Sequence, residues 1–195
     1  MILSQATLTV ALVALAVDAI IGWPDWLYRR IGHPVTWIGR LIAALDRRWN
    51  CGGHLILRGA LAVMMVVLVA VLPALALSAW LMPLTFGPVV LGVLAWPLVA
   101  TRSLYDHVAA VARPLAAGDA AAARQAVAMI VGRDLTDDPA PIARAALESL
   151  AENSSDGVVA PILWAAIAGL PGIAAYKAIN TLDSMIGHMS PRHAL

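Results

Sequence analysis

The feature that most constrains the fold of this chain is an apolar stretch over residues 59–82, which contains no charged side chain. A helix over this stretch, rising about 1.5 Å per residue, is long enough to cross the roughly 30 Å hydrocarbon core of a bilayer. The rest of the chain has the same character, because 61% of its 195 residues are hydrophobic and only 13% are charged. A soluble domain has roughly a quarter of its residues charged. The sequence therefore predicts an all-α, polytopic integral membrane protein.

Two further apolar segments, residues 6–22 and 85–100, are predicted to cross the membrane. The first lacks the basic region and small-residue cleavage site of a signal peptide, so we expect it to be retained. The second follows 59–82 after a very short turn, which predicts an antiparallel hairpin. A fourth segment, 158–176, is interrupted by glycine and proline at 169–172. Each of its halves is too short to span, which favours a broken or re-entrant helix over a straight one.

The placement of arginines orients the chain, because basic residues concentrate on the cytoplasmic side of membrane proteins. Residues 23–58 contain six arginines, whereas the turn between 59–82 and 85–100 contains none. We therefore expect 23–58 and 102–157 to be cytoplasmic, the latter as an alanine-rich helical segment, within one membrane domain over residues 1–195. The net charge of +1 gives no basic field for nucleic acid, which is excluded as a partner.

An acidic and amide cluster borders the last apolar segment. Both glutamates of the chain, Glu148 and Glu152, lie one helical turn apart and are followed by Asn153 and Asp156. Carboxylates beside a membrane segment are costly unless they are paired, hydrated or used. A surface ion pair with Arg144 would account for Glu148. The cluster also supplies oxygen ligands of the kind that magnesium takes when it bridges nucleotide phosphates, and we favour this functional interpretation.

Polar residues elsewhere each fit two roles. Lys177, the only lysine, lies near Asn180 and Asp183 after the interrupted segment. A helix resting on the membrane surface accounts for the lysine, but less well for an amide and a carboxylate one turn apart beside an intramembrane segment.

His33 precedes a proline and either binds phosphate or caps a turn. Arg40 either clamps an anion or anchors the cytoplasmic side.

Taken in order, these segments resemble the CobD/CbiB family of cobalamin-biosynthesis membrane proteins, the adenosylcobinamide-phosphate synthases. The resemblance rests on Asp18-x3-Gly22-x-Pro24, His33-Pro34-Val35-x2-Ile38-Gly39, Gly132-Arg133-Asp134, Glu148-x3-Glu152-Asn153-x2-Asp156-Gly157-x2-Ala160-Pro161 and Tyr176-Lys177-Ala178-Ile179-Asn180-Thr181-Leu182-Asp183-Ser184-Met185. Trp23 departs from it, since many members carry an acidic residue there. Members also continue beyond the position of Leu195, so we expect a C-terminally truncated or partial chain.

The resemblance implies a ligase that forms a carbon–nitrogen bond. Its expected reaction joins aminopropanol, or its O-phosphate, to a propionate carboxyl of adenosylcobyric acid with the consumption of ATP, giving adenosylcobinamide or its phosphate. ATP and Mg²⁺ are the implied cofactors, and the corrinoid is a substrate. The implied surroundings are the lipid bilayer of a bacterial inner membrane, an active face towards the cytoplasm, and other enzymes of the cobalamin pathway as partners.

Roles for individual residues are our own hypotheses, chosen to suit this reaction. The expected catalytic residues are Glu148, Glu152, Asn153, Asp156, Asn180 and Asp183, the expected phosphate- or substrate-binding residues are His33, Arg40, Arg133 and Lys177, and the expected magnesium ligands are Glu152, Asp156 and Asp183. Two other functions stay open. One is a small transporter or channel subunit, with Asp18, the break at 169–172 and Asp183 along its path. The other is a non-catalytic membrane scaffold for cobalamin enzymes.

Overall fold

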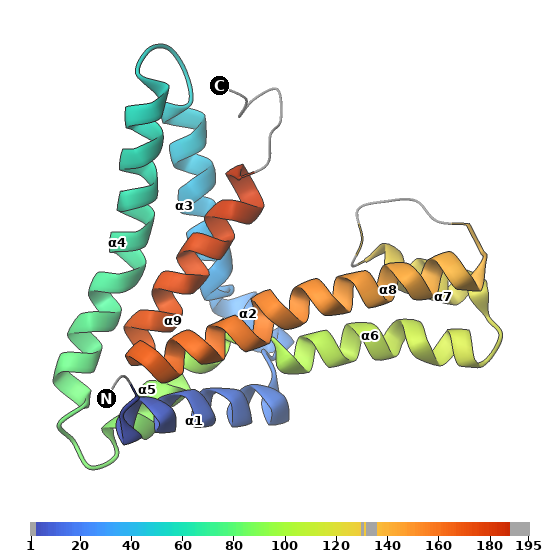
Figure 1. Cartoon of the computed structure of the whole chain (residues 1–195), viewed down its shortest axis with the longest axis horizontal. Helices are drawn as coiled ribbons and strands as arrows, with labels where there is room; N and C mark the ends of the chain where they lie inside the picture. Colours follow the sequence, from blue (N-terminus) through green and yellow to red (C-terminus); the bar gives the residue numbers. More distant parts are fainter. Residues whose placement is uncertain (1–2, 130, 132–135, 188–195) are drawn as a thin grey trace.

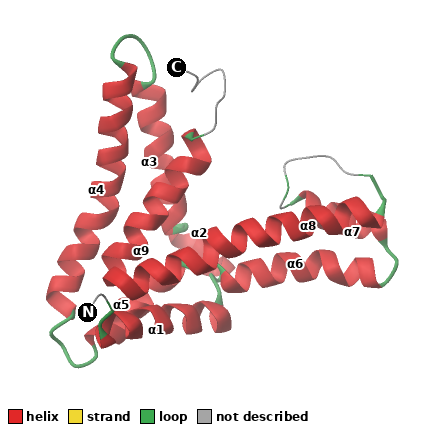
Figure 2. Cartoon of the chain, in the orientation of Figure 1, coloured by secondary structure: helices red, strands yellow, loops and turns green. Residues whose placement is uncertain are grey.

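The structure, a computed structural model, describes residues 3–129, 131 and 136–187 of the chain. Within these ranges it contains helices and no strand (Figure 2), which confirms the all-α prediction. The α-helices are α1 (Gln5–Ile21), α2 (Asp25–Ile31), α3 (Pro34–Trp49), α4 (Leu55–Leu81), α5 (Gly87–Ala95), α6 (Thr101–Ala116), α7 (Ala120–Ala128), α8 (Pro139–Ser154) and α9 (Ala160–Ile186). A 3₁₀ turn, η1 (Trp96–Leu98), precedes α6, and a π-helical turn, η2 (Ser155–Val159), joins α8 to α9.

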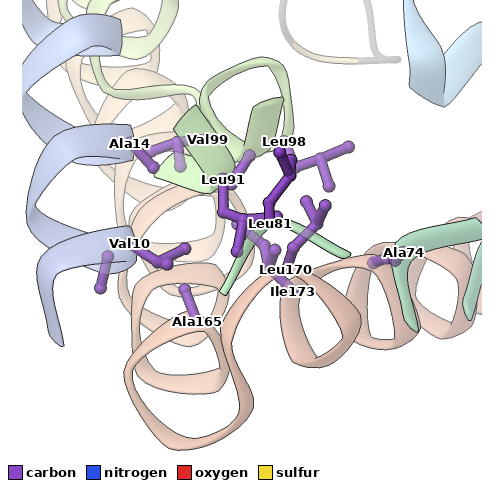
Figure 3. Close-up of a cluster of buried hydrophobic side chains, with 13 residues drawn as sticks. Val10, Ala14, Ala74, Leu81, Leu91, Leu98, Val99, Ala165, Leu170 and Ile173 are labelled. Carbon is purple, nitrogen blue, oxygen red and sulfur yellow. The ribbon is translucent and has the colours of Figure 1, made fainter. Parts of the chain in front are cut away.

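The helices form three groups, each with its own apolar core (Figure 1). At the base, α1 and α5 pack with the end of α4 and the middle of α9 around residues such as Val10, Leu91 and Ile173 (Figure 3). A second group, α3, α4 and the last part of α9, encloses Ile42 and Val66. The third group is an arm of α6, α7 and α8 that projects to the right in Figure 1 around a separate buried cluster.

Several helical runs have the length and composition of membrane spans. In the described part of the chain three qualify by themselves: Leu55–Leu81, Gly87–Ala116 and Pro139–Ile186. A fourth qualifies if α1 and the pair α2 and α3, which meet at an angle of 110°, are counted together as Gln5–Ile21 and Asp25–Trp49. Most of α4 faces outwards, since only 11% of its most apolar window is buried in the protein. These runs confirm the polytopic membrane character of the fold.

The antiparallel hairpin expected from 59–82 and 85–100 does not form. The second segment is divided into the nine-residue α5 and the turn η1, and α5 packs more extensively on α1 than on α4. Gly92 explains the preference, because a Cβ atom there would lie 2.6 Å from the Cβ of Val13 and 2.9 Å from the carbonyl oxygen of Val10. Small residues allow such close approach between membrane helices. The prediction from the short turn after α4 was therefore wrong, because α5 contacts mainly α1.

The chain bends sharply within α9, inside the stretch where the sequence predicts a break. Gly169 has φ 64° and ψ −148°, a conformation that L-residues with a side chain rarely adopt. Before this residue α9 continues the line of α8, and after it the helix turns back towards α3 and α4 (Figure 1). The two parts stay close, since a Cβ atom on Gly172 would lie 2.3 Å from the carbonyl oxygen of Trp164. The bend brings the last part of α9 back towards the turn η2, which precedes α9.

We predict that Gly92→Ala destabilises the protein by about 1–3 kcal/mol, the usual range for overpacking a close contact. Gly59→Ala is the matched control, because Gly59 is also helical but has no atom within 4 Å of its hypothetical Cβ, so it should be neutral or slightly stabilising. Thermal unfolding of both variants in detergent measures the difference. Equal stabilities would contradict the close packing of α5 on α1.

Candidate functional site

The acidic motif ends in a π-helical turn, η2, which interrupts the regular hydrogen bonding between α8 and α9. Such turns are rare and occur frequently at functional sites. Two consecutive carbonyl oxygens of η2 accept hydrogen bonds from other elements. Lys177 Nζ donates to Asp156 O at 3.1 Å, and the backbone N–H of Ala100 donates to Gly157 O at 2.9 Å. The turn is thereby tied both to α9 and to the residue that precedes α6.

Three side chains of α9 converge on Asp156. Asn180 Nδ2 donates to Asp156 Oδ2 at 3.0 Å, the Tyr176 hydroxyl is a further hydrogen-bond partner, and Lys177 binds the backbone carbonyl. Lys177 is only 9% exposed, so its ammonium group requires polar partners to offset its desolvation. We name the group Asp156, Tyr176, Lys177 and Asn180 the polar junction. The bend at Gly169 is what allows residues more than twenty positions apart to form it.

Asp18, the one acidic residue of α1, is buried and serves as a cap for a distant helix. Its Oδ2 accepts hydrogen bonds from the backbone N–H groups of Thr101 at 2.5 Å and Arg102 at 3.2 Å, at the start of α6. A carboxylate at a helix N-terminus satisfies otherwise unpaired N–H groups and interacts favourably with the helix dipole. The transporter interpretation would place Asp18 along a path, but its carboxylate is already used within the protein.

His33 caps the start of α3, which is one of the two roles expected for it. Its Nδ1 accepts a hydrogen bond from Val35 N at 3.2 Å, while the Thr36 hydroxyl donates to the His33 carbonyl at 2.7 Å. The ring lies edge-on to Trp23, with centroids 5.0 Å apart. The ring also makes a hydrogen bond with the backbone of Pro97, so the cap and this second contact together hold it in place. The structure therefore shows the capping role, and phosphate binding by His33 stays a prediction.

Two adjacent hollows lie beside the polar junction. The larger cleft, of about 600 Å³, is lined by His33 and Lys177 and by Arg102 and Asp106 of α6. Arg102 and Asp106 form an ion pair of 3.0 Å, which reduces the net charge on that wall. The smaller pocket, of about 220 Å³, lies between α6 and α8. Both hollows are lined by Ala100, Ser103 and His107, so they share one wall.

The remaining predicted site residues are dispersed. Glu148 and Glu152 are exposed on α8, Asp183 is exposed near the end of α9, and Arg40 is exposed on α3; none of these four lines either hollow. Asn153 does line the smaller pocket, where its Nδ2 donates to the carbonyl and hydroxyl oxygens of Ser149 at 2.8 and 3.1 Å. Arg133 lies outside the described residues.

The described residues contain no group of three His, Cys, Asp or Glu side chains that could hold a metal ion. Glu152, Asp156 and Asp183 are thus not gathered around one point. Magnesium bound with a nucleotide usually takes one or two protein carboxylates and completes its shell with phosphate oxygens and water. Asp156, half-buried at the polar junction, is the carboxylate best placed for that arrangement.

Sequence reasoning missed the contribution of α6. Ser103 and His107 are one helical turn apart and line both hollows, and Arg102 lines the cleft. The only local signal was the four-residue spacing of a hydroxyl and an imidazole, which is common on exposed helix faces. What places them in the site is the anchoring of the start of α6 by Asp18 and Gly157, two contacts that span 83 and 57 positions.

Comparison with known proteins gives a consistent result. A family model described as CobD/Cbib protein matches residues 11–195. The chain is 61% identical over 183 residues to a Rhodobacter capsulatus protein named cobalamin biosynthesis protein CobD, with 93% of this chain and 58% of that protein covered. Proteins of the same name from Sinorhizobium fredii and Halalkalibacterium halodurans are 44% and 40% identical, over 94% and 92% of this chain and 58% and 56% of their own lengths.

The chain therefore spans somewhat more than half the length of these relatives. No solved structure matches it.

We predict that Asp18→Ala lowers stability by about 1–2 kcal/mol, the usual cost of removing a helix cap. Asp18→Asn should cost less, because the amide oxygen can still accept from Thr101 and Arg102. Unfolding of the two variants, followed by the helical circular dichroism signal, measures the difference. Equal losses of stability in both variants would show that the cap is not what Asp18 contributes.

Proposed function

Because the chain belongs to the CobD/CbiB family, we propose that it works in cobalamin biosynthesis as a ligase that forms an amide bond on a corrinoid. The substrates are adenosylcobyric acid and aminopropanol or its O-phosphate, and the product is adenosylcobinamide or its phosphate. The observation that carries the proposal within this chain is the polar junction, which puts a buried lysine and a carboxylate beside a cleft in an otherwise apolar protein.

The reaction class sets clear demands on the site. A carboxylate has to be activated before an amine can displace one of its oxygens, and bound ATP with Mg²⁺ supplies that activation by phosphoryl transfer. Catalysis of phosphoryl transfer consists mainly of positioning and of neutralising negative charge. The protein must therefore offer cationic donors for phosphate oxygens, at least one carboxylate for magnesium, and a cavity large enough for the reacting groups.

The residues around the cleft fit those demands. An ammonium group carries three N–H donors, and Lys177 Nζ uses one of them on Asp156 O, so donors are left for a ligand. Lys177 and His33 both line the cleft. The ammonium group of Lys177 supplies a positive charge there, which favours an anion. The volume of about 600 Å³ lies within the range of ordinary ligand sites, roughly 300–1,000 Å³.

In this proposal Asp156 holds magnesium, and Lys177 and His33 contact phosphate oxygens. Asn180 holds the Asp156 carboxylate in place through their hydrogen bond of 3.0 Å. Asp156 and Asn180 line neither hollow, but their contacts tie them to Lys177, which lines the cleft. Glu148, Glu152, Asp183 and Arg40 are exposed and have weaker support, and Arg133 lies outside the described residues. The long apolar helices support a location in a bacterial inner membrane, with the cleft towards the cytoplasm where ATP is present.

Complementation tests the proposed function directly. The chain covers only 58% of its Rhodobacter capsulatus relative, so it should be expressed as a chimaera in which it replaces the matching part of that protein. In a strain unable to convert cobyric acid to cobinamide, we expect the chimaera to restore cobinamide formation, detected by mass spectrometry of corrinoids. A chimaera that inserts into the membrane but leaves cobyric acid unconverted would support the scaffold or transport interpretations instead.

We predict that Asp156→Asn in this chimaera lowers amidation by about a hundredfold or more, because charge stabilisation by a bound metal is worth several kcal/mol. The variant keeps an oxygen that accepts from Asn180, so the bend of α9 and membrane insertion should be preserved. Asp137→Ala is the control, since Asp137 pairs with Arg124 on the exposed arm. Full activity of Asp156→Asn would contradict the proposed role of this carboxylate.

A further inference from the structure

The smaller pocket has no role in the function proposed so far. It is bounded by Ser103, Leu104 and His107 of α6 and by Ser149 and Asn153 of α8, with Gly157 of η2 at its end. Its volume of about 220 Å³ is below the roughly 300–1,000 Å³ of pockets that hold drug-sized ligands. A nucleotide or a corrin ring is therefore too large for it, whereas a short amino alcohol is not.

The chemistry of the pocket lining suits an amine rather than an anion. Among the described residues, no lysine, arginine, aspartate or glutamate lines it, so neither a phosphate nor a permanent ammonium ion finds an opposite charge there. Hydrogen-bond acceptors are present. Since Asn153 Nδ2 is directed to Ser149, its Oδ1 oxygen is left to accept from a ligand N–H or O–H. Leu104 adds an apolar surface for a methyl group.

His107 stands at the wall shared by the pocket and the cleft, and its tautomer follows from its contacts. Its Nδ1 lies 2.6 Å from the carbonyl oxygen of Ser103, which can only accept a hydrogen bond. Nδ1 therefore carries the hydrogen, and Nε2 is the unprotonated nitrogen of the neutral ring. An imidazole held in this tautomer can take a proton through Nε2, as histidine commonly does in acid–base catalysis.

We propose that this pocket binds the amine end of the amino-alcohol substrate and that His107 accepts the proton released when the amide forms. The proposal rests on the function proposed above. In the step, the amine nitrogen forms the C–N bond to the activated carboxyl carbon. The bond from that carbon to the phosphate oxygen breaks, phosphate leaves with the electron pair, and the extra proton on nitrogen passes to His107 Nε2.

The pocket and the cleft then divide the reaction between them. The activated carboxyl group lies in the cleft, where Lys177 and His33 can contact phosphate oxygens, and the amine approaches through the shared wall at Ala100, Ser103 and His107. A pocket without a carboxylate favours the neutral amine, which is the nucleophilic form. If the amino alcohol carries a phosphate, that group extends outside the pocket, because no cationic side chain of the described part of the chain lines it.

Filling the pocket tests the binding part of the proposal. In the chimaera, Leu104→Phe should raise the KM for 1-amino-2-propanol and for its O-phosphate by about tenfold or more, since even one methylene changes pocket discrimination by about that factor. The KM for ATP should not change. Leu147→Phe is the matched control, because Leu147 is 64% exposed on α8 and does not line the pocket.

Replacing the imidazole tests the proton transfer. His107→Gln should lower kcat by about 10²–10⁴-fold, with little effect on the KM for ATP, and imidazole added to His107→Ala should restore part of the rate. His54→Asn is the control, because His54 is a histidine that lines neither hollow and whose left-handed backbone, at φ 61°, asparagine tolerates. Absence of rescue together with an unchanged kcat for His107→Gln would overturn the role of His107.

A binding assay separates failure of this inference from failure of the proposed function. Calorimetry of the purified chimaera with 1-amino-2-propanol should show binding that Leu104→Phe weakens and Leu147→Phe does not. If amidation occurs but Leu104→Phe changes neither binding nor KM, the amine pocket is wrong and the proposed function stands. If no amide forms but the binding pattern holds, the proposed function fails and the amine pocket stands.

Discussion

The arrangement of this protein depends on one polar contact inside an apolar environment, where the buried Lys177 ammonium binds the Asp156 carbonyl in the π turn. A buried ammonium is costly without partners, so the contact constrains both segments that supply it. It requires α9 to reverse at Gly169, and it is reinforced by the hydrogen bond between Asn180 and the Asp156 carboxylate. The reversal in turn directs the last part of α9 against α3 and α4, where Leu182 packs with Ile42 and Val66. The hydrogen bonds of Lys177 and Asn180 and the apolar packing of Leu182 thus both stabilise the bend at Gly169.

The π turn has a second consequence, because it also fixes the arm. Gly157 accepts from the backbone of Ala100, and the Asp18 carboxylate caps the first residues of α6. The arm of α6, α7 and α8 has its own apolar core, so its helices are held together independently of the base. Its attachment through backbone groups at the start of α6 places Ser103 and His107 beside the polar junction. The cleft lies where α1, α3, α6 and α9 end or pass, and the smaller pocket lies between α6 and α8 of the arm. Both are bounded by helices, which favours a pre-formed site.

The two hollows can be related to the reaction that we propose from membership of the CobD/CbiB family. The amide ligation that we propose would bring together a charged, phosphorylated group and a neutral nucleophile, which need different surroundings. The cleft offers cationic donors and the smaller pocket offers uncharged polar groups, and the two share one wall. Asp18 and the bend in α9 would suit a transport path, but here Asp18 caps a helix and the bend supports the polar junction. A broken membrane helix can therefore position polar side chains within the protein, and it does not have to line a transport path.

The sequence by itself determined the helical membrane character, the interruption of α9 at glycine and proline, and the family. These follow from composition, from the uncharged run at 59–82 and from ordered motifs, all of which act locally along the chain. It also singled out Asp156, Lys177 and Asn180, but together with Glu148, Glu152 and Asp183, which are exposed and line neither hollow. Only the tertiary structure joined Asp156 to Lys177 and Asn180 by hydrogen bonds, placed α5 on α1, and brought His107 to the wall shared by the two hollows. The reason is physical: the packing at Gly92 and the capping of α6 by Asp18 join segments about 80 residues apart, and such contacts depend on shape and on hydrogen-bond geometry that no local pattern encodes.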